Sequence, residues 1–150
     1  MAGQIIRAAD HLPAVFAEDP SNLTNLTNTG WAAGDPALSI TFTAPTSGRG
    51  RIDIAATIDE DTDAGGVRCS VEVREGGPTG AVVFSPSLDN GIRRYWSVAA
   101  PENETDSAFV FLSGLNPGGI YWAQFQFQIR TTPTGGLDID HRVILYQPLT

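Results

Sequence analysis

The first residues that could do chemistry form an acidic run. Asp59, Asp61 and Asp63 stand at the first, third and fifth positions of a calcium-loop register, where alternating carboxylates supply oxygen ligands. That register needs glycine at its sixth position and glutamate at its twelfth, but the chain has Ala64 and Ser70 there. We therefore interpret the run as a solvated hairpin loop whose two following glycines supply positive φ, with a weak calcium site of another type as the alternative.

Nucleophilic catalysis would need a base beside the nucleophile, and the chain has two histidines. His11 lies in an unpatterned stretch, and His141 lies on the apolar side of an alternating segment with Ile139 and Val143, as a structural histidine would. No nucleophile elbow, phosphate-binding glycine loop or metal-spaced histidine pair is present. Sugar hydrolysis would need two carboxylates at a suitable separation in space, and nothing in the sequence singles out such a pair. We expect a protein that is not an enzyme and needs no cofactor.

Charge and cysteine content exclude further classes. The formal net charge of −8 would repel a phosphate backbone, so nucleic acid is not an expected partner. A single cysteine, Cys69, excludes an internal disulfide and a multi-cysteine zinc site within one chain, and its alternating context predicts a small buried residue. The start of the sequence has no long apolar region and no 18-residue apolar run occurs, so no signal peptide or membrane span is expected.

One polar row could form a ligand or subunit face. Gln124, Gln126 and Gln128 alternate with apolar residues, and Trp122 and Arg130 stand at the ends of the row. A glutamine buried without partners costs about 1–3 kcal/mol, so the row must face water or be paired across a polar interface. Three interpretations of Trp122 stay open: it packs under a neighbouring loop, contacts a second subunit or stacks on a sugar.

The elements that must position these residues are strands. Apolar and polar residues alternate from Ser39 onward, and strands are predicted at 39–44, 51–58, 67–74, 81–84, 92–98, 107–112, 121–130 and 137–147. The segment 107–112 is apolar on both faces, which predicts a central strand or a subunit contact. About eight short strands indicate an all-β protein, an antiparallel β-sandwich of jelly-roll or immunoglobulin-like type, which we assign to residues 38–150.

A turn before the glutamine row is similar to a known device of β-sandwiches. Leu115, Pro117, Gly118 and Tyr121 have the spacing of a tyrosine corner, in which the tyrosine hydroxyl bonds back to the main chain at the preceding corner. Here that bond would fall near Leu115 or Asn116. The motif predicts a structural corner and says little about function.

Residues 1–37 lack strand alternation and are assigned as an N-terminal arm and linker. Ordering about 16 residues costs roughly 1–2 kcal/mol each, while burying an apolar side chain returns about 1.5–3 kcal/mol. Side chains alone would therefore not hold the arm, which needs main-chain pairing with its own sheet or with a partner. The candidate docking residues are Ile5, Ile6, Arg7, Leu12, Val15 and Phe16.

Four segments in order, GQIIRAADHLPA, SITFTAPTSGRGRIDI, GLNPGGIY and HRVILYQPL, carry a family resemblance. The chain resembles small structural proteins of tailed phages and prophages of actinobacteria, described as minor tail or minor capsid components. Its nine basic residues are all arginine, which agrees with a GC-rich coding genome. The resemblance implies a β-sandwich or jelly-roll, commonly trimeric, on the virion exterior, and it supplies no site residues.

The expected function follows from that resemblance. We expect a capsid decoration or cement protein, made in the host cytoplasm, whose arm docks on the major capsid protein or another virion protein. The alternatives are a minor tail or fibre protein that contacts the host surface, and a carbohydrate-binding module.

Overall fold

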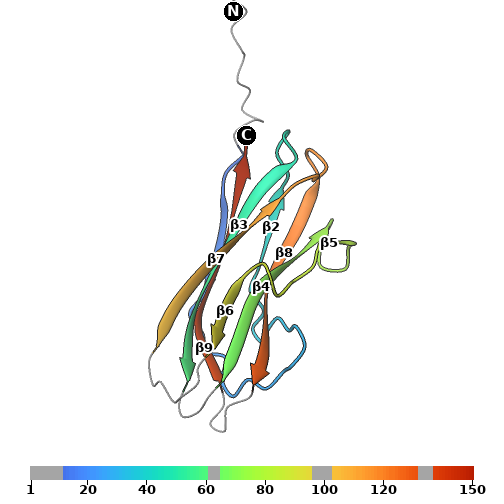
Figure 1. The fold of residues 1–150 in the computed structure, drawn as a ribbon. Helices are drawn as coiled ribbons and strands as arrows, with labels where there is room; N and C mark the ends of the chain where they lie inside the picture. The colour runs from blue at the N-terminus through green and yellow to red at the C-terminus, as the bar shows by residue number, and fades with distance from the viewer. Residues whose placement is uncertain (1–11, 61–64, 96–102, 132–136) are drawn as a thin grey trace, which may run out of the picture.

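The fold consists of strands. The computed structural model describes residues 12–60, 65–95, 103–131 and 137–150, and these contain no helix (Figure 1). Nine strands are described: β1 (Val15–Asp19), β2 (Ser39–Thr43), β3 (Arg49–Glu60), β4 (Gly66–Glu75), β5 (Val82–Phe84), β6 (Ile92–Tyr95), β7 (Glu104–Leu112), β8 (Ile120–Thr131) and β9 (Leu137–Leu149). Within the described part no helix is long and apolar enough to cross a membrane. The predicted all-β class is confirmed.

The strands form two antiparallel sheets packed face to face. Sheet A has the order β1-β9-β3-β7, and sheet B has the order β2-β8-β4-β5, with β6 also pairing with β4. Most consecutive strands lie in opposite sheets, so the chain crosses the sandwich repeatedly (Figure 1). The alternating apolar residues of the sequence fill the space between the sheets, and Cys69 is buried there as predicted. Burial raises the pKa of its thiol far above the ordinary value.

The start of the described chain belongs to the sandwich. β1 pairs with β9 from Val15 opposite Tyr146 to Asp19 opposite Arg142. Further on, Leu23 is buried and pairs with Ile139 of sheet A, and Ala32 pairs with Phe127 of sheet B. Residues 15–37, assigned to the arm from the sequence, are therefore part of the sandwich, because they take up main-chain hydrogen bonds at the edges of β9 and β8. Ile5, Ile6 and Arg7 lie outside the described residues.

A β-bulge reverses the side-chain alternation of β9. The register shifts so that Thr57 faces His141 while Ile58 faces Ile139, which leaves Asp140 as the extra residue. The expected placement of His141 on the apolar side is wrong, because beyond the bulge Arg142 points inward and His141 points outward. Nε2 of His141 lies 3.7 Å from Oε2 of Glu18.

Carboxylates gather around this bulge. Burial raises the pKa of Asp140, and Asp59 and Asp138 add to the rise. Asp61 and Asp63, the other members of the calcium-loop register, lie outside the described residues. Among the residues that are described, no group of His, Cys, Asp and Glu is arranged to hold a metal ion.

β7 lies at an edge of sheet A. It pairs only with β3 among the described strands, so the central-strand prediction for 107–112 is wrong. Phe109 and Phe111 point away from the core and are 52% and 62% exposed. The segment 107–112 is apolar on both faces because its outer face exposes two phenylalanines. The subunit contact predicted from the sequence is the interpretation that remains.

Candidate functional site

The predicted glutamine row lies on the outer face of sheet B. β8 runs between β2 and β4, and the β4 residues Arg68, Ser70, Glu72 and Arg74 stand opposite Gln128, Gln126, Gln124 and Trp122. Two of the three glutamine amides donate hydrogen bonds within the chain, while the buried Oε1 of Gln128 has no partner among the described residues. The Gln126 side-chain amide donates to Oε1 of Gln124 at 2.7 Å, and that of Gln128 donates to the Thr29 carbonyl. Trp122 is half-buried, and its three interpretations stay as predictions.

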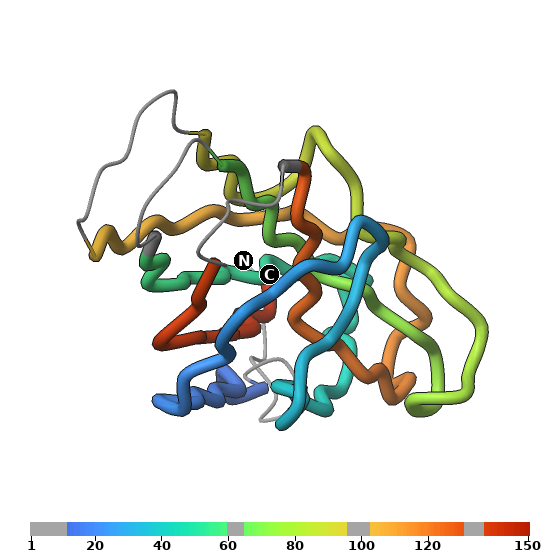
Figure 2. Tube along the Cα trace, turned by 90° about the horizontal axis from the view of Figure 1, so that it is seen from below, coloured from blue at the N-terminus to red at the C-terminus, as the bar shows by residue number. Residues whose placement is uncertain are grey.

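Two loops lie against this face. The segment 20–38 crosses from sheet A to sheet B, as its blue-to-cyan course in Figure 2 shows, and pairs with the free edge of β8. There the amides of Phe127 and Ile129 donate to the carbonyls of Ala32 and Asn28, both at 2.8 Å. From the other side, the Ser70 hydroxyl donates to the Asn90 carbonyl at 2.6 Å and is fully buried. Hydrogen bonds thus fix both loops to this face, and a hollow adjoins them.

A buried arginine joins β1, β9 and the 20–38 segment. Arg142 is fully buried, and its Nη2 donates to Oδ2 of Asp19 at 2.5 Å. Its Nη1 donates to the carbonyl oxygens of Pro36 and Ala33 at 3.0 and 3.4 Å. Hydrogen bonds from the hydroxyl and the amide of Ser21 lower the pKa of Asp19, and Arg142 adds to this against the effect of burial. Sequence alternation missed Arg142 because the bulge that turns it inward leaves no local signal.

Arg130, the last member of the predicted row, belongs to an arginine–tyrosine cluster. Its Nη1 donates to the Tyr95 hydroxyl at 3.2 Å, and Nε of Arg68 donates to the same oxygen at 2.6 Å. Burial is the largest single influence and opposes ionisation of Tyr95, but the hydrogen bonds from Arg130 and Arg68 and the positive charges of both together lower the pKa of the phenol. A hollow of about 460 Å³ adjoins the two arginines and is also lined by Thr29, Leu88 and Gln128.

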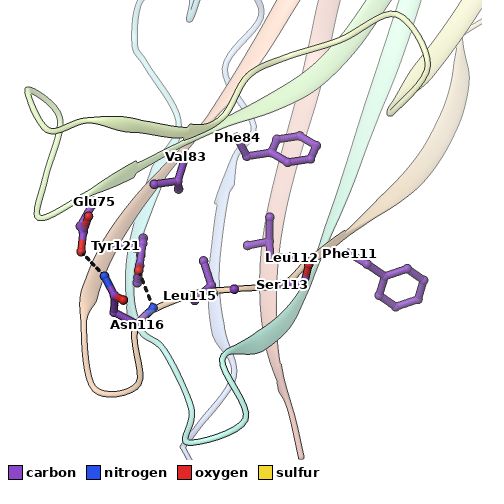
Figure 3. Close-up of a pocket in the computed structure, with 10 residues that line it drawn as sticks. Glu75, Val83, Phe84, Phe111, Leu112, Ser113, Leu115, Asn116 and Tyr121 are labelled. Atoms are coloured by element: carbon purple, nitrogen blue, oxygen red, sulfur yellow. Dashed lines mark hydrogen bonds between the residues drawn. The ribbon is translucent and has the colours of Figure 1, made fainter.

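The turn before β8 has the geometry of a tyrosine corner. The Tyr121 hydroxyl accepts a hydrogen bond from the Asn116 amide at 2.8 Å, and Leu115 is buried. Gly118 has a φ of +76°, which a glycine adopts without strain. The Asn116 side chain donates to Glu75 of β4 at 2.8 Å, so the corner is tied to sheet B (Figure 3).

A lateral cleft of about 420 Å³ opens beside this corner (Figure 3). Val83, Phe84 and Phe111 line it, so it lies between the edge strands β5 and β7. Nearer the start of β7 the two sheets are joined by ion pairs. Nη1 of Arg94 in β6 lies 3.1 Å from Oδ2 of Asp106, and Arg94 also pairs with Glu104. Sequence reasoning did not predict the cleft, because its walls come from strands that meet only in the folded sandwich.

Apolar side chains cross the outer face of sheet A. One row joins Phe16, Leu145, Asp53 and Phe109 across the four strands. The guanidinium carbon of Arg51 lies 4.5 Å from the centre of the Phe109 ring. We call this surface the sheet A strip, and its apolar members are Phe16, Ala55, Phe109, Phe111, Val143 and Leu145.

The strip contains one of the arm-docking candidates. Phe16 points outward and is 56% exposed. Val15 is half-buried and packs against the core. Leu12 is half-buried too and lies beside Val15, Thr43 and Ile120. The structure therefore separates three residues that the sequence grouped together, since only Phe16 faces outward on the strip.

Solved structures are similar to this chain, but they do not assign it to a family. No protein-family model and no curated protein matches the chain. A chain from the structure of infectious bursal disease virus, Gx strain, is similar with a TM-score of 0.49 and 9% identity, over 93% of this chain and 32% of that one, so this chain spans about a third of it. CsCBM6-3 from Clostridium stercorarium, solved with cellobiose, gives 0.30 and 14%, over 91% and 88%. The enzymatically active domain of bacteriophage CBA120 tailspike protein 4 gives 0.36 and 12%, over 91% and 19%. These likenesses concern strand arrangement, and function must be inferred from the residues themselves.

Proposed function

We propose that this protein is a non-enzymatic structural component of a bacteriophage virion, a capsid decoration protein that attaches to the shell through sheet A. The observation that carries the proposal is the difference between the two outer faces. Sheet A presents three exposed phenylalanines, Phe16, Phe109 and Phe111. The centre of sheet B instead presents the polar side chains of β8 and β4, several of which are hydrogen-bonded within the chain, and its exposed apolar residues are those of the edge strands and loops and Ile120. Such a sandwich is suited to attachment by one face and exposure of the other.

The sheet A strip exposes large apolar side chains on either side of the Arg51–Asp53 ion pair. Exposed apolar patches with polar neighbours mark interaction sites. Phe16, Phe109 and Phe111 are each more than half exposed. Full burial of such a side chain is worth about 1.5–3 kcal/mol, so completing the burial of the three returns roughly 2.5–5 kcal/mol. That gain is useful for docking but insufficient alone.

Main-chain pairing can supply the remainder. β7 is nine residues long, and among the described strands it pairs only with β3, so no described strand is hydrogen-bonded to its other edge. A strand edge of this kind pairs readily with a segment of another chain. The partner fitted by the sheet A strip and the β7 edge is an extended, partly apolar segment of a shell protein such as the major capsid protein.

The proposal also includes a jelly-roll topology and a trimeric assembly. Strand order β1-β9-β3-β7 over β2-β8-β4-β5, with repeated crossing between sheets, supports the jelly-roll over the immunoglobulin-like alternative. The family resemblance supports a homotrimer on the virion exterior, with an actinobacterial phage as the source. A minor tail or fibre protein uses the same surfaces and differs in copy number.

Copy number on purified virions distinguishes these roles. A decoration protein should be present in hundreds of copies per particle, as measured by quantitative mass spectrometry against the major capsid protein. A handful of copies per particle would reject the decoration role and favour the tail or fibre.

Variants test the attachment surface directly. Phe109→Ser/Phe111→Ser should lose at least about tenfold in binding to particles that lack the protein, which corresponds to roughly 1.4 kcal/mol. Ile120→Ser is the control, because Ile120 is 54% exposed but belongs to β8 of sheet B. Unchanged binding of the double variant would place attachment elsewhere. Removal of residues 1–11, which leaves β1 intact, tests the arm separately.

A further inference from the structure

Arginines concentrate on the outer face of sheet B in an otherwise acidic protein. Arg93, Arg68 and Gln128 stand in one cross-strand row, from β6 through β4 to β8. Like charges directly opposite each other destabilise a sheet, so the Arg93–Arg68 pair has a cost. Asp89 offsets it in part by pairing with Arg93 at 3.0 Å. A third guanidinium, that of Arg130, adjoins the row.

One tyrosine aligns two of these guanidiniums. The Tyr95 hydroxyl accepts hydrogen bonds from both Arg68 and Arg130. Their guanidinium carbons lie 5.7 and 5.2 Å from the centre of its ring. Within the part of the chain that the structure describes, neither arginine pairs with a carboxylate, unlike Arg51, Arg74 and Arg142. Each guanidinium carries five N–H donors, so both keep donors for an external acceptor.

The space beside the pair is large enough for a small ligand. The hollow has a volume of about 460 Å³, within the roughly 300–1,000 Å³ of small-molecule sites. Leu88 contributes an exposed apolar side chain to its lining. Gln128 holds Thr29 at the rim through its hydrogen bond to the Thr29 carbonyl, so the rim is fixed by the 20–38 segment.

The charge of the whole chain selects among anions. With a net charge of −8, the protein repels extended polyanions such as nucleic acid or an anionic membrane. A small ligand with a single anionic group is attracted by the nearby arginines and is repelled little by the net charge of the chain. A planar guanidinium can bind a carboxylate through two parallel hydrogen bonds.

We propose that the hollow binds an acidic sugar, with Arg68 and Arg130 holding its carboxylate and Leu88 contacting the C–H face of its ring. The site lies on the sheet opposite to the sheet A strip. An attached protein would therefore present it outward, although the assignment does not depend on attachment to a virion.

Titration with D-glucuronate, followed by isothermal calorimetry or amide chemical shifts, tests the assignment. Glucuronate should bind, and neutral D-glucose should not. Arg68→Gln and Arg130→Gln should each weaken glucuronate binding at least about tenfold, as expected when a charge-assisted hydrogen-bonding group is removed. Arg51→Gln on sheet A is the matched control and should leave binding unchanged.

Stability separates a binding role from a structural one. Arg68→Gln removes the repulsion from Arg93 and also the hydrogen bond to Tyr95, so the melting temperature should change little while glucuronate binding weakens at least about tenfold. If Arg68→Gln lowers both the melting temperature and the affinity for glucuronate, Arg68 has a structural role and the proposal is overturned. Inorganic phosphate or acetate binding as tightly as glucuronate would reject the sugar assignment in favour of a simple oxyanion site, and no glucuronate binding would reject the site altogether. Particle attachment is measured separately, so either proposal can fail alone.

Discussion

Neutralising Asp19 should destabilise the protein more than removing its buried partner. In Asp19→Asn the Arg142 guanidinium stays fully buried without its countercharge, and its acceptors, the carbonyls of Ala33 and Pro36 among them, are all neutral. Breaking a buried ion pair by removing one partner costs about 3–5 kcal/mol. The Asp19 side chain retains 15% exposure, so we expect the lower end, about 3 kcal/mol. With a urea slope of about 2 kcal/mol per M, the midpoint should fall by roughly 1.5 M.

The reverse substitution should cost less. Arg142→Met places an apolar side chain of similar length in the core, and Asp19 keeps its hydrogen bonds from Ser21. Replacing a buried ion pair by apolar residues is often neutral or stabilising. The double variant Asp19→Asn/Arg142→Met should therefore be more stable than Asp19→Asn alone, which a double-mutant cycle would show as a coupling energy.

Urea denaturation followed by tryptophan fluorescence measures all four proteins. The pKa of Asp19 is lowered in the folded state, so its contribution is fully present above the ordinary aspartate pKa of 3.8 and is lost as pH falls through the folded pKa. The difference between wild type and Asp19→Asn should accordingly shrink near the acid end of the titration. A loss below about 1 kcal/mol for Asp19→Asn, or a double variant no better than the single, would refute this account of the buried pair.

Two further substitutions test the corner and the bulge. Tyr121→Phe removes the acceptor of the Asn116 amide and should cost about 0.5–1.5 kcal/mol in urea denaturation. Tyr146→Phe is its control, since the buried Tyr146 hydroxyl has no partner among the described residues and its removal should be neutral or stabilising; equal losses would contradict the corner. The pKa of Asp140 is raised, so its ionised form costs stability at neutral pH and the cost disappears as pH falls below the folded pKa. Asp140→Asn should raise the melting temperature at pH 7 and leave it unchanged near pH 3, and a gain at both would show that charge is not the cause.

Local patterns predicted the strands well because burial between two sheets imposes a period of two on each strand. The segment Val67–Arg74 shows this, since its apolar members are buried in β4 as expected. The spacing of Pro117, Gly118 and Tyr121 likewise predicted a corner whose hydrogen bond spans only five residues, from Asn116 to Tyr121. In both cases the determining interactions are encoded within a few neighbouring residues.

Other features depend on pairing between distant segments. β1 carries little alternation, and it is a strand because β9 offers it an edge more than a hundred residues later in the chain. The bulge that turns Arg142 inward arises from the register of β9 on β3, which no local pattern records. For the same reason the sequence placed 107–112 in the middle of a sheet, whereas topology puts β7 at an edge with its phenylalanines outward.

The candidate sites divide in the same way. By itself the sequence determined a strand-rich acidic protein and a glutamine row ending at Arg130. Only the tertiary structure brought Arg68 and Arg130 to one tyrosine, tied Gln128 to the 20–38 segment and left the phenylalanines of the sheet A strip exposed. Side-chain periodicity fixes which way a residue points within its own strand. Which strands become neighbours, and therefore which charges and rings meet, is decided by the packing of the whole chain.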